Sequence, residues 1–135
     1  MPEWLPAPGA QALELVHERT GRVIASRIEL AVTRQTRRVG LLGRSSLEPA
    51  AALVLAPCCM IHTAFMRFSI DVLFIDRQGL ALRVVHGLTP WRAAGSLRAY
   101  AAIEMAAGVL RRHTINTGDR IHLQPVALSV NAPAC

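Results

Sequence analysis

Residues 57–79 read PCCMIHTAFMRFSIDVLFIDRQG and decide the fold of this 135-residue chain. From Met66 to Phe74 every second residue is apolar, a pattern typical of a strand with one buried face. Residues 72–75 are apolar on both faces, so we expect this part of the strand to be covered from both sides. The following DRQG predicts a tight turn in which Gly79 takes a positive φ. The stretch is therefore predicted as a central strand that enters a hairpin.

Short segments of strand and helix character lie on both sides of this stretch. We expect strands at residues 12–17, 22–32, 51–56, 80–86, 100–105 and 121–128, and short helices at residues 34–42, with Thr33 as N-cap, and 107–112. The predicted fold class is mostly β (α+β): a small single-domain antiparallel β-barrel or a strongly twisted sheet with two short helices. Residues 1–11 are expected as a flexible N-terminal arm, residues 12–128 as the domain and residues 129–135 as a flexible tail.

The charge of the chain indicates what kind of partner it attracts. All 15 of its basic residues are arginine, and the formal net charge is +6. This excess favours an anionic small molecule or an acidic protein partner, unless it only solvates the surface. A basic stripe of Arg34, Arg37, Arg38 and Arg44 could contact nucleic acid. Because no stacking aromatics or known nucleic-acid motif accompany these arginines, nucleic acid is the weaker hypothesis.

The cysteines and the hydropathy pattern bear on location. Three cysteines cannot form a closed set of disulfides, and Cys58 and Cys59 are adjacent, so we expect reduced thiols and a cytoplasmic location. No basic start followed by an apolar segment marks a signal peptide. No run of about 18 apolar residues predicts a membrane span.

Several motifs resemble a known family. They are RQTRRVGLLGRSSL at residues 34–47, IHTAFMRFSIDV at 61–72, IEMAAGV at 103–109 and NTGDRI at 116–121. Over about residues 22–123 the chain is similar to the bacterial and archaeal family called domain of unknown function 192. It departs from that family at Ser69, where proline is usual, and at Ala51, where glycine is usual. The resemblance implies a compact, β-rich single domain and names no activity.

Two loops carry the candidate ligand-binding residues, which are His62, Thr63, Arg67, Asp71, Trp91 and Arg92. The guanidinium fork of an arginine suits a carboxylate or a phosphate. A turn centred on residues 77–78 pairs residues whose numbers sum to about 155, which sets Leu88 opposite Arg67 and brings the two loops together. We therefore expect a pocket between the His62 and Trp91 loops for an anionic small molecule or peptide. Two alternatives stay open: Asp71 accepts backbone N–H bonds instead, or Trp91 closes one end of a barrel.

Two further hypotheses use the cysteines. In the first, Cys58 or Cys59 is a nucleophile that His62 activates in a hydrolytic or redox enzyme, which requires a sulfur within about 4 Å of the imidazole. In the second, thiols, thioethers and imidazole, from Cys58 to Met66, bind Cu(I) or zinc. The sequence lacks the CxxC pairs of structural zinc sites, so we assign no metal and no cofactor.

Overall fold

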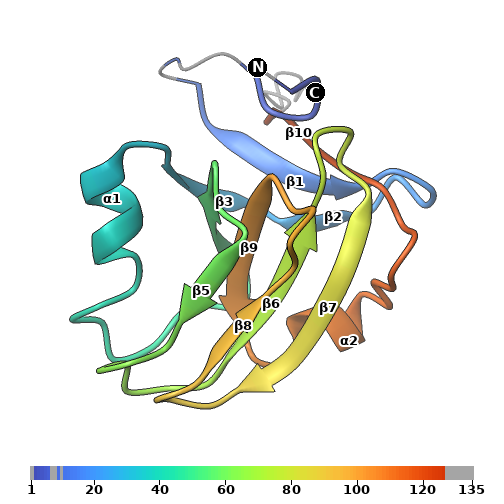
Figure 1. Ribbon diagram of the computed structural model, residues 1–135. Coiled ribbons are helices and arrows are strands. Elements are labelled where there is room, and N and C mark those ends of the chain that lie inside the picture. Colours follow the sequence, from blue (N-terminus) through green and yellow to red (C-terminus); the bar gives the residue numbers. More distant parts are fainter. Residues whose placement is uncertain (1, 7–8, 10, 127–135) are drawn as a thin grey trace, which may run out of the picture.

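The computed structural model describes residues 2–6, 9 and 11–126 (Figure 1). The described chain forms the strands β1 (Leu13–His17), β2 (Val23–Ala25), β3 (Arg27–Ala31), β4 (Ala51–Leu55), β5 (Met60–His62), β6 (Ile70–Ile75), β7 (Ala81–Leu88), β8 (Ala93–Gly95), β9 (Ala101–Ala106) and β10 (Ile121–Pro125), and the helices α1 (Arg34–Val39) and α2 (Val109–Arg112). Within these residues no helix has the length and apolar character needed to cross a membrane.

The strands form three sheets. The largest has the order β3-β4-β9-β6-β7 and is antiparallel except for the β3–β4 pair, which is parallel. A second sheet has the order β10-β1-β2, and β5 and β8 form a two-stranded ribbon. Across the described residues the sheets do not close into a barrel. The mostly β, twisted-sheet form of the predicted fold class is therefore confirmed, and the barrel form is not adopted.

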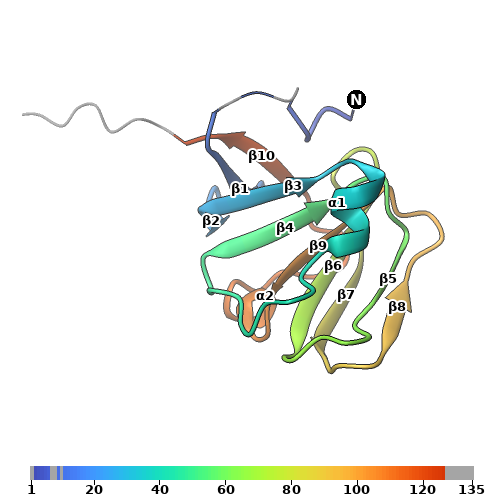
Figure 2. The same cartoon turned by 90° about the vertical axis from the view of Figure 1, so that its left-hand side faces the viewer.

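The middle of the five-stranded sheet, formed by β4, β9 and β6, is buried on both faces, as the central stretch predicts. All six residues of β6 are buried. One apolar cluster includes Leu73, Ile75, Leu15 of β1 and Leu110 of α2, and the other joins β6 through Val72 and Phe74 to residues of β5, β8 and the loop after α1. Figures 1 and 2 show α1 and the β5–β8 ribbon on one side of this sheet. The domain thus has two cores that share one sheet.

The N-terminal segment is part of the first core. Trp4 is only 3% exposed, its indole Nε1 donates to the Asp76 carbonyl at 3.1 Å, and its own carbonyl accepts from the Leu123 N–H at 3.0 Å. Leu5 is buried beside it. Residues 2–6 belong to the segment expected as a flexible arm, and here they pack against the domain because burying the large indole offsets the freedom that a short segment loses. The predicted tail at residues 129–135 lies outside the described residues.

Several predicted boundaries also differ in the structure. The expected strand at residues 22–32 divides at Ser26 into β2 and β3, which join different sheets. The central strand begins at Ile70 rather than Met66, and Ile70 pairs with Leu88, so the predicted partner of Leu88 is wrong. Two irregularities in the β6–β7 register, one between Phe74 and Ile75 and one across Asp71, shift the pairing. Thr33 does cap α1, through a reciprocal capping box with Thr36, and Gly79 does take a positive φ of 80°.

Candidate functional site on the β5 and β8 loops

The two predicted loops lie side by side. β5 and β8 pair antiparallel, with His62 opposite Ala93, and the pairing continues beyond the strands. The Thr63 N–H donates to the Arg92 carbonyl at 2.8 Å, and the Trp91 N–H donates to the Thr63 carbonyl at 3.0 Å. Backbone hydrogen bonds therefore join the loops.

Thr63 fastens the loops and does not reach solvent. Its side chain is fully buried, and its hydroxyl donates to the Thr89 carbonyl at 2.6 Å and accepts from the Arg92 N–H at 2.9 Å. Both capacities of the hydroxyl are thus used within the protein. Thr63 positions the Trp91 loop and is not placed to contact a ligand.

Phe65 and Trp91 form an exposed aromatic pair at the tip of these loops. Their ring centroids lie 4.6 Å apart at an interplanar angle of 58°, and the residues are 72% and 62% exposed. Both backbones are left-handed, with φ of 66° and 65°. A bulky side chain in this region costs about 1–3 kcal/mol, and such residues cluster at functional sites. Packing in the core does not explain this pair, and exposed aromatic side chains that lie together are typical of an interaction surface.

Three of the predicted side chains stand near the aromatic pair along the chain. His62, Arg67 and Arg92 are all exposed. Neither guanidinium forms an ion pair with another residue of the described chain, while the His62 Nδ1 accepts the Ala64 N–H at 3.3 Å. Both arginines are thus available to an anion. We call Phe65, Arg67, Trp91 and Arg92 the aromatic–arginine tip.

Asp71 lies apart from this tip. It is completely buried, and its carboxylate accepts the N–H groups of Gly87 at 2.8 Å, Gly108 at 2.9 Å and Leu110 at 3.1 Å. Both oxygens are engaged in holding β7 and the start of α2. The geometry supports the alternative role, an acceptor of backbone N–H groups, rather than the ligand contact expected for Asp71.

His62 also lines a small cavity on the sheet side of β5. The cavity has a volume of about 60 Å³ and also touches Arg38, Cys58 and Glu104. Glu104 is 4% exposed, and burial raises its carboxyl pKa to about 7, against the opposing effect of the Arg44 charge. Glu104 is not among the site residues predicted from the sequence. The available signal was a lone acid inside the apolar strand AAIEMA.

The cysteines show no sign of an activated nucleophile. The Cys58 thiol donates to the Met60 carbonyl at 3.2 Å, and burial, followed by the Glu104 charge, raises its pKa. Cys59 is exposed, and in the described structure neither sulfur hydrogen bonds to His62. A raised pKa means little thiolate at neutral pH, which disfavours the enzyme hypothesis. Among the described residues, no group of three or more His, Cys, Asp or Glu side chains could hold a metal ion.

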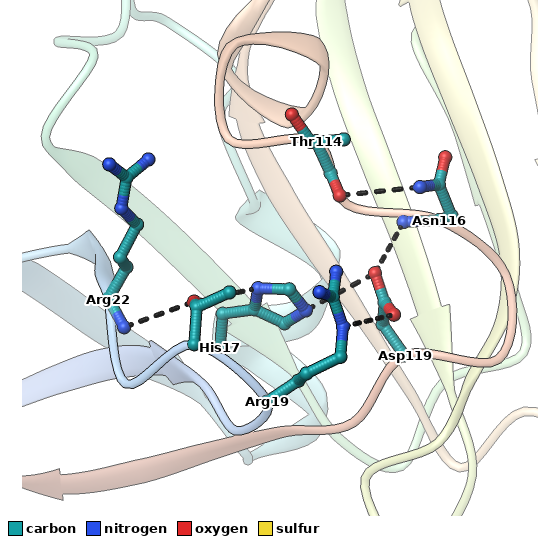
Figure 3. A network of polar contacts seen from close by, with 7 residues as sticks. His17, Arg19, Arg22, Thr114, Asn116 and Asp119 are labelled. Carbon is teal, nitrogen blue, oxygen red and sulfur yellow. Dashed lines mark hydrogen bonds and ion pairs between the residues drawn. The ribbon is translucent and has the colours of Figure 1, made fainter.

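A second polar cluster surrounds His17 (Figure 3). The buried imidazole contacts the Thr20 hydroxyl through Nδ1 at 3.0 Å and lies 3.2 Å from an Asp119 carboxylate oxygen through Nε2. Asp119 also accepts the Asn116 N–H at 2.8 Å and lies 3.9 Å from the Arg19 guanidinium. These contacts connect the β1–β2 turn to the loop before β10. The network connects the two turns, although the buried His17 Nε2 approaches Asp119 at 3.2 Å without forming a well-aligned hydrogen bond.

The fold and loops define a class: a mostly β, α+β domain whose exposed aromatic and arginine side chains sit on paired loops over a twisted sheet. The family model of DUF192, described as "Uncharacterized ACR", matches residues 15–123. The chain therefore belongs to the DUF192 family.

Two solved structures share this fold. One is a Sinorhizobium meliloti protein described as a candidate transcription regulator, with a TM-score of 0.72, 22% identity and coverage of 86% of this chain and 97% of that one. The other is a Novosphingobium aromaticivorans protein of unknown function, with a TM-score of 0.69, 20% identity and coverage of 90% and 92%. The chain has no match among curated proteins. At these identities the two structures establish the fold alone.

Proposed function

We propose that this chain is a binding domain whose aromatic–arginine tip recognises an anionic small molecule or an acidic peptide. The observation that carries the proposal is the Phe65–Trp91 pair, exposed and left-handed, with Arg67 and Arg92 close to it in sequence and without ion-pair partners in the described chain. Surface arginines usually have little effect on stability, so their placement here is better explained by a partner.

The chemistry of the tip fits such a ligand. Guanidinium groups donate charge-assisted, often bidentate hydrogen bonds to carboxylates and phosphates. The rings of Phe65 and Trp91 offer an apolar surface that would cover the non-polar part of the same ligand. The net charge of +6 increases the rate at which an anion meets the surface. His62, exposed on β5, is a further donor for the anion.

Nucleic acid is a weaker partner on the same reasoning. Of the four arginines in the predicted basic stripe, Arg37 donates to the carbonyls of Val32 and Ala56, and Arg44 pairs with Glu29 at 2.7 Å. Half of the stripe is thus engaged within the protein. The description of the Sinorhizobium relative as a candidate transcription regulator makes duplex DNA a necessary comparison in any binding assay. The adjacent free thiols of Cys58 and Cys59 also support the inference of a reducing, cytoplasmic setting.

The test uses the tryptophan fluorescence of the full chain. Trp91 is exposed and Trp4 is buried, so a ligand at the tip changes mainly the Trp91 signal. The probes are succinate, inorganic phosphate, a synthetic peptide of alternating aspartate and leucine, and a duplex DNA. We expect saturable binding of at least one carboxylate or phosphate probe. Arg67→Ala and Arg92→Ala should each weaken it about tenfold or more, the effect of losing one charge-assisted hydrogen bond.

Matched controls separate the tip from general charge and general hydrophobicity. Arg34→Ala removes an exposed arginine of α1, and Leu97→Ala removes an apolar side chain that is 93% exposed. Both should bind as the native chain does. The proposal fails if the Arg34 variant loses as much affinity as the Arg67 variant, or if only DNA binds.

A further inference from the structure

The sheet face beneath β5 carries a buried carboxyl, and one of its oxygens has no hydrogen-bond partner in the described chain. Glu104 lies in the middle of β9, opposite Leu53 of β4 and Val72 of β6. Its residue is 4% exposed, and its Oε2 atom accepts no hydrogen bond from the described chain. A buried polar atom without a partner costs free energy of folding. The residues opposite Glu104 on both neighbouring strands are apolar and offer no side-chain donor, so a group from outside the chain must supply the missing hydrogen bond.

The carboxyl faces a cavity large enough for more than a water molecule. Its volume is about 60 Å³, whereas one water occupies about 30 Å³ in the liquid. The buried part of its wall is apolar, formed by Leu41, Leu55, Ile61 and Met66. An apolar wall with a single acceptor suits a small organic group that brings its own hydrogen-bond donor.

The charges around the cavity restrict the ligand further. Three charged or titratable side chains line the cavity with Glu104: Arg38 of α1, and Cys58 and His62 from the segment that includes β5. The charge of Arg44, in the loop after α1, also acts on Glu104. Arg44 is engaged by Glu29, and the Cys58 thiol by the Met60 carbonyl. Exposed Arg38 and His62 remain, so donors line the mouth while an acceptor lies at the floor.

Neither a simple cation nor a simple anion fits this arrangement. A cation meets the like charge of Arg38 on entry, and an anion meets Glu104 inside. We propose that the cavity binds a small zwitterion, with its ammonium group on the Glu104 carboxylate and its own carboxylate on Arg38 and His62. The small volume of the cavity, about 60 Å³, favours a short, unbranched amino acid. This site shares only His62 with the surface of the two loops, and it does not rest on the proposed function.

The acid–base properties of the site are consistent with this occupant. Burial holds the Glu104 pKa at about 7, so the carboxyl is partly protonated near neutral pH. An ammonium group stabilises the ionised form and lowers that pKa. Binding should therefore release a proton near neutral pH and strengthen as the pH rises through about 7.

The experiment is an NMR titration of the full chain with carbon-labelled glutamate, at constant ionic strength. The probes are glycine, which carries both charges, methylammonium, which carries one, and acetate, which carries the other. We expect glycine to shift the Glu104 carboxyl signal saturably and to lower its pKa, methylammonium to bind more weakly, and acetate to leave the signal unchanged. Arg38→Gln should weaken glycine binding about tenfold.

Variants keep the test decisive. Glu104→Gln retains the shape of the side chain and should abolish glycine binding, which calorimetry can detect without the Glu104 signal. Glu3→Gln, at an exposed carboxyl, should bind glycine as the native chain does. The proposal is overturned if glycine gives no saturable shift, if acetate binds as well as glycine, or if Glu104→Gln still binds.

Discussion

Glu104 and Asp71 are both buried carboxyl groups, and they differ in the donors that surround them. Three backbone N–H groups point at Asp71, whereas the Oε2 atom of Glu104 has no donor in the described chain. Hydrogen bonds to a carboxylate offset the loss of water on burial, and without them the protonated form is favoured. The same side-chain chemistry therefore produces a structural anchor at one position and a group that can change its charge at the other.

The stability of the protein should depend on pH through Glu104. Its folded pKa of about 7 lies above the ordinary value of 4.5. Below about pH 4.5 both states are protonated, and between the two values only the unfolded state ionises, so stability falls as the pH rises through this window. Glu104→Gln removes that fall. The free energy of unfolding of the variant, relative to that of the native chain, should therefore rise by ~3 kcal/mol between acidic and neutral pH.

Urea unfolding on both sides of the window measures this difference. Glu3→Gln is the control, because that carboxyl is exposed. A constant difference between the Glu104 variant and the native chain at all pH values would contradict the argument.

At the scale of elements, short strands depend on single side chains for their position. β5 and β8 have three residues each, too few to hold a ribbon by their own hydrogen bonds. Thr63 extends the pairing by fastening the Trp91 loop, and Asp71 connects β7 to α2 across the sheet edge. Loop geometry at the candidate site thus depends on buried polar contacts rather than on strand length.

Thr63→Val should loosen the Trp91 loop. The change keeps the shape of the side chain but leaves the Thr89 carbonyl and the Arg92 N–H without their partner, at a cost of about 1–3 kcal/mol. Hydrogen exchange of the Arg92 amide should accelerate, and probe binding at the tip should weaken. Thr63→Ser, which retains the hydroxyl, should restore most of the protection. Unchanged exchange in the valine variant would show that the strand pairing alone holds the loop.

Asp71→Asn should destabilise the domain by about 2–4 kcal/mol, because the new amide nitrogen would face backbone N–H donors in a buried site. Chemical denaturation gives the value. Asp76→Asn is the comparison. The Asp76 carboxylate accepts two backbone N–H groups but is only half-buried, so this variant should lose less stability. A loss below about 0.5 kcal/mol for the Asp71 variant would exclude the anchoring role.

At the scale of the whole molecule, one five-stranded sheet separates two apolar cores. The β1–β2–β10 sheet, α2 and Trp4 cover one face, and the β5–β8 ribbon with the loop after α1 covers the other (Figure 2). The first core is the larger and includes both ends of the described chain, through Trp4 and Leu123. The second is thinner and contains Glu104 and its cavity, so the candidate sites both lie on the less heavily covered side.

The two tryptophans offer a direct test of this division. Trp4→Ala should cost about 3–5 kcal/mol, the usual range for truncating a buried aromatic residue. Trp91→Ala, at a residue that is 62% exposed, should cost less than about 1 kcal/mol. Urea denaturation compares the two variants with the native chain. If Trp4→Ala lost as little stability as Trp91→Ala, the N-terminal segment would not belong to the core.

The sequence by itself determined the central strand, the hairpin turn at Gly79, the cap at Thr33 and the mostly β fold, because each depends on local periodicity or on the backbone preference of one residue. Burial on both faces of β6 was readable for the same reason. Only the tertiary structure decided that Trp4 is core, that Asp71 is an anchor and that Glu104 faces a cavity. These outcomes depend on partners far along the chain, such as Asp76, 72 positions from Trp4, and Gly108, 37 positions from Asp71. The register irregularities in β6–β7 show why a count along the chain misses such pairings. Local backbone preferences and hydrophobic periodicity determine where the helices and strands form. The burial of a polar group depends instead on which distant hydrogen-bond donors the folded chain places beside it.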